Sequence, residues 1–336
     1  MSDTKRTASF IRNNDLERLL SELNNLLSTV NLKACDDFSE RHTKIFIVGA
    51  LRSGTTLFTQ WLASTGAVAY PTNLLSRFYG APLIGAKIQQ LLTDQRYNYR
   101  NEILDFNSNI SFESENGKTR GALAPNEFWY FWRRFLPFSD LDYLPDDELI
   151  QQGDMDGLHN ELNGISNIFE KPFALKAMIM NQNLLVLDQL FKNSLFIWIK
   201  RDPVYNIQSV LNARQRQYGD INTWYSFKIR EYEDLKERPP LESAVGQVLS
   251  INNSIQTAMS ELDEYKKLFI PYEDFCDRPR QYYQTVIEKL TRLNPAYTLS
   301  SEYQGPQRFE NTNKWTCKDF TESDVRTYLQ STNITA

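Results

Sequence analysis

The feature that most constrains the fold of this chain is a short apolar run that leads directly into a glycine-bounded loop. The run Lys44-Ile-Phe-Ile-Val48 is apolar and rich in β-branched residues after its lysine, which predicts a buried strand. The loop Gly49-Ala-Leu-Arg-Ser-Gly54 follows, and Thr55–Ser64 reads as a helix. These segments predict a strand–loop–helix unit, which is typical of a parallel sheet covered by helices.

Further short apolar runs alternate with helical patterns along the rest of the chain. We expect strands at Phe173–Ala177, Leu195–Ile199 and Lys267–Tyr272, and helices at about 204–217, 241–264 and 280–292. Residues 66–170 are rich in aromatic side chains and lack clean strand patterns, so we expect helices and long loops there. The alternation predicts a three-layer α/β/α fold with a central parallel sheet, like that of P-loop NTPases.

The domain organisation follows from the length and from the absence of a linker. A chain of 336 residues is long enough for two domains, but no repeat or low-complexity segment divides it. We expect a single domain over 44–336, with an insertion at about 66–170, preceded by a helical extension over 1–43. The extension contains apolar residues at helical spacing, which predict a helix packed on the domain: Leu16, Leu19, Leu20, Leu23, Leu26, Leu27 and Val30.

Charge and hydropathy exclude several classes of protein. The net charge of −5 argues against a nucleic-acid partner, because such domains are usually strongly basic. The most apolar stretch, Ile45–Leu51, is far shorter than the ~18–20 residues of a transmembrane helix. The first ten residues contain no apolar signal core. We therefore expect no transmembrane segment.

The cysteines and histidines indicate a cytoplasmic protein without a metal site. The chain has only two histidines and three cysteines, and the cysteines are widely separated, at Cys35, Cys276 and Cys317. This spacing suits reduced thiols and supports neither a disulfide scaffold nor a zinc site.

The chemistry of the glycine-bounded loop indicates a phosphate ligand. Its backbone N–H groups and the helix N-terminus favour an anion, and Arg52 adds a positive charge. Hydroxyl donors are also present, at Ser53, Thr55 and Thr56. The loop of nucleotide triphosphatases needs a lysine where this chain has Thr55, so we expect a single 5′-phosphate and its leaving group, not a magnesium-bound triphosphate. The alternative is a strand–helix connection without a ligand.

A second motif follows the third predicted strand. Arg201 lies at the carboxyl end of that strand, where the ligand crevice of a parallel sheet opens, and Ser209 lies in the next helix. Both can bind a second phosphate, the arginine through charge-assisted hydrogen bonds. In the alternative interpretation, Arg201 forms an ion pair with Asp202 and Ser209 has no role in binding.

The two motifs together resemble those of the sulfotransferase superfamily, which uses 3′-phosphoadenosine-5′-phosphosulfate (PAPS). The run Arg52-Ser-Gly-Thr-Thr56 is similar to the 5′-phosphosulfate loop of tyrosylprotein-type and many bacterial members, where cytosolic members commonly have lysine in place of the arginine. Arg201 followed by Ser209 resembles the 3′-phosphate motif. A further likeness is the Y-E-D stretch that begins at Tyr272, and the resemblance extends over about 44–292.

The resemblance implies in-line sulfuryl transfer from PAPS to an acceptor, without a metal. The donor-binding residues that it implies are Arg52, Ser53, Gly54, Thr55, Thr56, Arg201, Ser209 and Lys314. Arg52 would also stabilise the charge that develops on the leaving group. Lys314 is included because Asn311–Trp315 resembles the late segment that closes over the cofactor in this superfamily.

Two further residues are catalytic candidates. Glu127 resembles the carboxylate that serves as general base in non-cytosolic sulfotransferases, and Lys176 ends a predicted strand and can contact the transferring group. The alternatives are that Glu127 is an acid in the first turn of a helix and that Lys176 is a solvated lysine.

The acceptor that we expect is a carbohydrate or glycan hydroxyl, although other small molecules with a hydroxyl group stay open. The aromatic series Phe128–Trp132 is too continuous for one helix face, and exposed rings there would stack on a sugar. Two other functions also stay open. One is an ATP-dependent P-loop phosphotransferase, and the other is a non-catalytic protein that binds a phosphorylated nucleotide.

Overall fold

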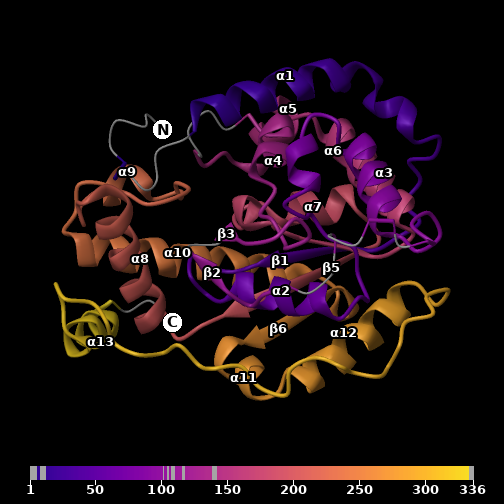
Figure 1. Cartoon of the computed structure of the whole chain (residues 1–336). Helices are drawn as coiled ribbons and strands as arrows, with labels where there is room; N and C mark the ends of the chain where they lie inside the picture. The colour runs from indigo at the N-terminus through magenta and orange to yellow at the C-terminus, as the bar shows by residue number, and fades with distance from the viewer. Residues whose placement is uncertain are drawn as a thin grey trace.

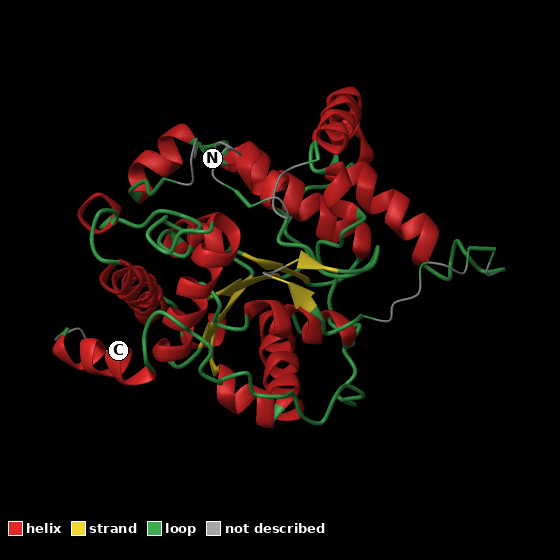
Figure 2. Cartoon of the chain, turned by 60° about the vertical axis from the view of Figure 1, so that its left-hand side comes forward, coloured by secondary structure: helices red, strands yellow, loops and turns green. Residues whose placement is uncertain are grey.

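The computed structural model describes residues 6–7, 13–100, 102–103, 106, 110–115, 118–137 and 142–332. Its centre is a four-stranded parallel sheet in the order β4-β1-β5-β6. The strands are β1 (Lys44–Val48), β4 (Phe173–Lys176), β5 (Ser194–Lys200) and β6 (Lys267–Pro271). Figure 2 shows helices above and below this sheet. The predicted three-layer α/β/α fold with a central parallel sheet is confirmed.

Side chains on the two faces of the sheet belong to separate cores. Ile45 and Ile47 of β1 belong to the core on one face of the sheet, whereas Phe46 and Val48 belong to the core on the other face. All five residues of β1 are buried, because helices cover both faces of a parallel sheet. This double burial explains why the run is continuously apolar instead of alternating.

The helices divide between the two cores. The first group comprises α2 (Thr55–Ser64), α11 (Tyr272–Asp277) and α12 (Pro279–Leu293). The second comprises α3 (Pro82–Thr93), α4 (Trp129–Phe135), α5 (Asp146–Gln152), α6 (Met155–Phe169), α7 (Leu184–Leu190), α8 (Pro203–Tyr218), α10 (Pro240–Glu261) and α13 (Glu322–Ser331). In Figure 1, α11 and α12 lie below the sheet, and α3, α4, α5 and α6 lie above it.

The remaining elements are short, apart from α1. They are α1 (Asn14–Asn31), α9 (Tyr232–Leu235), the hairpin β2 (Ser114–Glu115) and β3 (Lys118–Thr119), and the 3₁₀ turns η3 (Leu32–Ala34), η4 (Leu75–Phe78), η5 (Met178–Met180) and η6 (Glu264–Lys266). Within the described ranges, no helix combines the length and apolarity that a membrane crossing requires.

The predicted elements agree with the structure to within a few residues. The four strands and the helices of 204–217, 241–264 and 280–292 are all present, as β1, β4, β5, β6, α8, α10 and α12. The described residues of 66–170 form helices, loops and the short hairpin β2–β3, and they include α3 to α6.

Helix α1 packs on the body, but partly through polar residues that the leucine pattern did not indicate. The buried Asn24 donates to the Arg77 carbonyl and accepts from the Gly80 N–H, at 2.8 and 2.6 Å. Asn31 is also buried and donates to Glu161. Several apolar residues of the predicted pattern are exposed: Leu16, Leu19, Leu26 and Val30. The apolar face of α1 is wider than its contact with the body.

The topology places a crevice between β1 and β5. These strands are neighbours, with Val48 opposite Trp198. The helix after β1, α2, packs on one face of the sheet, whereas the helix after β5, α8, packs on the other. Loops that diverge in this way at the carboxyl ends of adjacent strands leave a ligand crevice between them.

The buried Lys44 makes stability depend on pH. Its side chain is fully buried at the start of β1, with Nζ donating to the His42 carbonyl at 2.6 Å, and burial lowers its pKa from 10.5 to about 8. Between these two values the unfolded chain keeps a proton that the folded chain loses, so this residue makes stability rise with pH. We expect the free energy of unfolding of the wild type, relative to Lys44→Met, to increase by about 1 kcal/mol from pH 7 to pH 9.

Urea denaturation of both proteins at the two pH values measures this difference. Because the tyrosines and other alkaline groups are common to both proteins, their contribution cancels. A difference that is constant between pH 7 and pH 9 would show that Lys44 has an ordinary pKa in the folded chain.

Candidate active site

The glycine-bounded loop lies at the carboxyl end of β1, against β5 and α11. A Cβ atom on Gly49 would lie 2.5 Å from the Ile199 carbonyl oxygen. Gly54, which precedes α2, has a φ of +94°, and a Cβ there would lie 2.3 Å from the ring of Tyr272. Both glycines are therefore required by close contacts, and Gly54 also by its left-handed backbone.

Two buried polar atoms in this loop lack hydrogen-bond partners among the described residues. They are Nε of Arg52 and Oγ of Ser53. Arg52 itself adopts a left-handed backbone, with a φ of +63°, which is strained for a residue with a side chain. An unsatisfied buried donor costs about 1–3 kcal/mol, and an anionic oxygen would satisfy both atoms. The loop therefore fits a phosphate group.

Arg201 joins the second motif to the loop. Its side chain is buried after β5, and Nη1 donates to the Arg52 carbonyl at 3.2 Å. Its Nε donates to Asn313 at 2.7 Å, and Nη2 donates to the Thr312 carbonyl at 3.0 Å. Burial is the main cause that lowers the pKa of Arg201, and the charge of Arg52 contributes. Two arginines from distant parts of the chain therefore meet at one crevice.

The alternative pairing of Arg201 with Asp202 is not what the structure has. The Asp202 carboxylate caps α8 by accepting the Val204 N–H at 2.9 Å. The Arg201 guanidinium instead donates hydrogen bonds to the loop and to the segment 312–313.

Ser209 and Lys314 belong to segments that adjoin Arg201: Ser209 lies on α8, which begins two residues after Arg201, and Lys314 follows Asn313, which accepts from Arg201. Ser209 is half-buried on α8. Its neighbour Gln208 binds the Lys314 carbonyl at 2.9 Å and thereby holds the C-terminal segment on α8. The Lys314 ammonium is exposed and pairs with Glu310 at 2.7 Å. The structure thus places the backbone of Lys314 near the second motif, with its charge at the surface.

Glu127, Lys176 and Thr56 form a second cluster on the other side of the loop. Lys176 is buried at the end of β4, where its Nζ contacts Oε1 of Glu127 and donates to Oγ1 of Thr56 at 3.0 Å. Neither alternative holds: Lys176 is only 6% exposed, and Glu127 precedes α4 and pairs with a lysine instead of capping a helix. An ammonium group thus reaches the first turn of α2 from the neighbouring strand.

Indole groups fix both members of this cluster. Nε1 of Trp129 donates to Oε2 of Glu127, and Nε1 of Trp132 donates to the Lys176 carbonyl at 3.1 Å. Phe128, between Glu127 and Trp129, has a left-handed backbone with a φ of +59°. The cluster borders a shallow cavity whose space, including its open mouth, is about 180 Å³, and which is lined by Glu127, Trp129, Trp132, Lys176, Met178 and Ile179. Part of the aromatic series therefore lines a cavity, and part belongs to the core.

Several residues at the crevice were not predicted. The Tyr272 ring packs against Gly54 and lies under the Arg201 guanidinium, 5.1 Å from its centre, and the Tyr272 hydroxyl shares a hydrogen bond with Thr312. Burial raises the pKa of Tyr272. Asn181 holds Gly49 through both its amide nitrogen and its amide oxygen. The Y-E-D stretch was a signal for Tyr272, whereas Asn181 belongs to no motif.

Tyr225 is a further unpredicted neighbour of the site. Its pKa is raised mainly by burial, while the charge of Arg52 lowers it and that of Glu127 raises it. The phenol therefore lies within electrostatic range of both groups. Ser226, the next residue, has a left-handed backbone with a φ of +71°. No local pattern in the sequence connects this loop with the phosphate motif.

The three cysteines form no disulfide. Cys35, Cys276 and Cys317 are free, and Cys276 and Cys317 are buried. In the described portion of the chain, no three side chains among His, Cys, Asp and Glu gather so that they could hold a metal ion.

The close packing at Gly54 leads to a prediction. We expect Gly54→Ala to lower affinity for adenosine 3′,5′-bisphosphate by about tenfold, because a side chain there strains the backbone and displaces the Tyr272 ring, at about 1–3 kcal/mol. Calorimetric titration measures the affinity, with Gly66→Ala as the control. Gly66 also has a positive φ, of +70°, but a Cβ there meets nothing within 4 Å. Equal affinity in the two variants would contradict the assigned role of Gly54.

Comparisons with known proteins agree with the fold and with the expected superfamily. The sequence matches the sulfotransferase family over residues 44–292, which includes the loop, Arg201 and Ser209. Among curated proteins, no sequence matches this chain.

Solved structures support the same fold. Sulfotransferase STF9 from Mycobacterium avium superposes with a TM-score of 0.58 at 15% identity, covering 98% of this chain and 88% of that one. Sulfotransferase STF1 from Mycobacterium tuberculosis gives a TM-score of 0.57 at 15% identity, covering 97% and 87%. Because the family match spans the strand–loop–helix unit, the second motif and most of the sheet, this chain belongs to the sulfotransferase family.

Proposed function

We propose that this protein transfers the sulfuryl group of PAPS to a hydroxyl group of a carbohydrate or glycan acceptor. The observation that carries the proposal is the contact between Arg201 and the Arg52 carbonyl at 3.2 Å. This contact joins the glycine-bounded loop to the second motif, the two segments that we propose to bind the two phosphate groups. A nucleotide with phosphate groups at both its 3′ and 5′ positions is the ligand that suits two such groups.

The loop and the second motif divide the donor between them. The 5′ end would be held by the loop N–H groups, the Arg52 guanidinium and the hydroxyls of Ser53, Thr55 and Thr56. The unpartnered Nε of Arg52 and Oγ of Ser53 support this assignment. The 3′-phosphate would be held by Arg201 and Ser209. Lys314 would reach it after leaving Glu310, its partner in this structure.

PAPS supplies the sulfuryl group, which passes to the acceptor oxygen as the bond between sulfur and the oxygen of the 5′-phosphate breaks. Arg52 and the loop amides would stabilise the negative charge on that oxygen, the kind of electrostatic contribution that is usually largest. Lys176 would hold oxygens of the transferring group, because its ammonium lies at the first turn of α2. Lys176 would thus supply a positive charge in place of the lysine that nucleotide triphosphatases have at the position of Thr55.

Glu127 would accept the proton of the acceptor hydroxyl. Its carboxylate lies beside Lys176 and borders the 180 Å³ cavity, where an acceptor oxygen can approach. Trp129 and Lys176 hold the two carboxylate oxygens in a fixed orientation, which a general base requires.

The same observations weigh against the other two functions. An ATP-dependent phosphotransferase would need the lysine that Thr55 replaces, and a magnesium ion on its triphosphate. A non-catalytic binding protein would have no need of the Glu127–Lys176 ion pair beside the loop. The indole groups of the cavity wall support a sugar as the acceptor, because aromatic rings stack on sugar faces.

Transfer of radioactive sulfate from labelled PAPS tests the proposal. We expect the wild type to label at least one member of a panel of neutral oligosaccharides and simple phenols, and Arg52→Ala to label none. Exposed Arg216 on α8 provides the control variant Arg216→Ala, which should retain transfer. If Arg52→Ala loses only affinity and the wild type transfers nothing, the protein is a binder. If phosphate from labelled ATP is transferred instead, it is a phosphotransferase.

A further inference from the structure

A second cleft adjoins the cavity at Glu127 and Lys176. Its space, including the open mouth, is about 300 Å³, and its walls come from the turn after β4, the segment at residues 142–143 and the segment at 227–228. Met178 and Ile179 line both this cleft and the smaller cavity, so the two spaces are adjacent. A molecule in the cleft would therefore extend toward the proposed transfer site.

The wall of the cleft is fixed to the phosphate loop. Asn181 accepts from the Gly49 N–H at 3.3 Å and donates to the Gly49 carbonyl at 2.8 Å. Asn183 donates to the Leu144 carbonyl at 3.0 Å and to Asp146 at 2.6 Å. The side-chain amides on either side of Gln182 are thus held by the protein, so this wall of the cleft is not a loose surface loop.

Gln182 has one donor without a partner. Its Oε1 accepts the Arg230 N–H at 3.2 Å, whereas its Nε2 is buried and makes no hydrogen bond among the described residues. A buried donor in this state costs about 1–3 kcal/mol. An oxygen atom of a ligand in the cleft would satisfy it.

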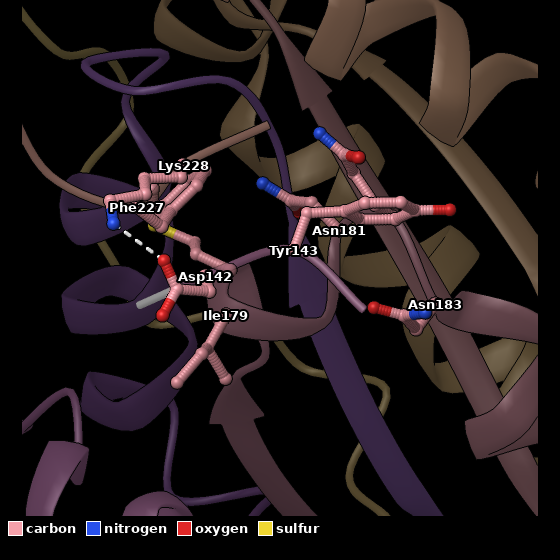
Figure 3. A pocket seen from close by; sticks show the side chains of 9 residues that line it. Asp142, Tyr143, Ile179, Asn181, Asn183, Phe227 and Lys228 are labelled. Carbon is pink, nitrogen blue, oxygen red and sulfur yellow. Dashed lines mark hydrogen bonds and ion pairs between the residues drawn. The ribbon is translucent and has the colours of Figure 1, made fainter. Parts of the chain in front are cut away.

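The other polar groups of the cleft suit hydroxyl groups. Asp142 and Lys228 form an ion pair at 2.5 Å, so their charges offset each other. Tyr143 accepts from Arg230 at 3.0 Å through its hydroxyl oxygen, and its own proton can be donated. Figure 3 shows the ion pair on one side of the cleft, and Tyr143, Asn181 and Asn183 on the other. Such a site favours a neutral molecule with several hydroxyl groups over an apolar one, which would leave these groups unsatisfied.

We propose that this cleft binds the acceptor through a neutral, polyhydroxylated ring, and that Gln182 donates a hydrogen bond from Nε2 to one of its oxygens. This inference rests on the proposed function, since it assigns the acceptor side of the same reaction. It names Gln182 as a residue that determines acceptor affinity, apart from the residues that bind the donor.

Saturation-transfer NMR titration with a panel of neutral methyl glycosides tests the inference, with cyclohexylmethanol as a ring of similar size that carries one hydroxyl. We expect the wild type to bind at least one glycoside more tightly than cyclohexylmethanol. Gln182→Glu keeps the shape and the acceptor of the side chain but removes the donor, and should weaken glycoside binding by at least about fivefold, the loss of one hydrogen bond. Gln182→Leu should weaken it similarly, and Gln281→Leu, at an exposed glutamine of α12, should not.

Three results would overturn the inference: binding of no glycoside, unchanged glycoside affinity in Gln182→Glu, or equal binding of cyclohexylmethanol. Titration of the same proteins with adenosine 3′,5′-bisphosphate separates this failure from failure of the proposed function. If the bisphosphate binds and the glycosides do not, the assignment of the cleft is wrong. If the glycosides bind through Gln182 but the bisphosphate does not bind, the donor assignment is wrong and the cleft assignment stands.

Discussion

Replacing Arg201 with alanine is expected to lower the affinity for adenosine 3′,5′-bisphosphate by about 100-fold. A charge-assisted hydrogen bond from the guanidinium to the 3′-phosphate contributes about 1.5–3 kcal/mol, whose upper end corresponds to about 100-fold, and the variant loses it. The affinity for 5′-AMP, which lacks the 3′-phosphate, should fall by less than about tenfold, since only the support of the Arg52 carbonyl is lost. Calorimetric titration of both nucleotides measures the two changes.

The control for this prediction is Arg216→Ala, which removes an exposed arginine from α8. It should leave both affinities unchanged. A loss for Arg201→Ala that is equal for the two nucleotides would mean that Arg201 only supports the loop, through its contact with Arg52. The assignment of Arg201 to the 3′-phosphate would then be wrong.

Replacing Glu127 with glutamine is expected to lower turnover by about 10²–10⁴-fold, the usual contribution of a general base. The amide has the same shape as the carboxylate but cannot accept the acceptor proton at neutral pH. Binding of adenosine 3′,5′-bisphosphate should stay within about twofold because, among the described residues, the Glu127 carboxylate contacts Lys176 and Trp129 and not the loop or Arg201. Initial rates with labelled PAPS and the best acceptor of the panel provide the measurement.

The matched control is Glu288→Gln, at an exposed position of α12, and it should turn over like the wild type. Full activity of Glu127→Gln would remove Glu127 from the mechanism. A parallel loss of turnover and of bisphosphate affinity would instead assign it to the structure of the loop, through its ion pair with Lys176.

The sheet and the positions of the loop and of Arg201 were predictable from the sequence, because their signals are local. Continuous apolar runs predicted strands buried on both faces, and β1 and β5 are such strands. The loop and Arg201 follow these strands directly, so the parallel order brings their carboxyl ends together. The meeting of Arg52 and Arg201 therefore follows from topology, although its exact contact does not.

The acceptor side could be predicted only in part, because its contacts join residues far apart in the chain. Glu127 and Lys176 were separate candidates, and no pattern indicated that they form an ion pair. The amide of Asn181 reaches Gly49 from a turn that carries no motif. The exposed leucines of α1 have the same physical origin: helical spacing shows which residues share a face, but not how much of that face another element covers.

The C-terminal segment illustrates the same limit. Its likeness to a cofactor-closing segment led to Lys314, yet the contacts with Arg201 come from Thr312 and Asn313. Asn313 is itself held by Glu273, at 2.7 Å, from the Y-E-D stretch. Such a relay depends on side-chain directions in three separate segments, which sequence spacing alone does not determine.

The central claim is that one crevice binds both ends of a doubly phosphorylated adenosine. Competition between adenosine 3′,5′-bisphosphate and magnesium-bound ATP, measured by calorimetry on the wild-type protein, tests it most directly. We expect the bisphosphate to bind more tightly by at least about tenfold, because the loop has Thr55 in place of the lysine that ATP requires. Tighter binding of ATP with magnesium would contradict the claim.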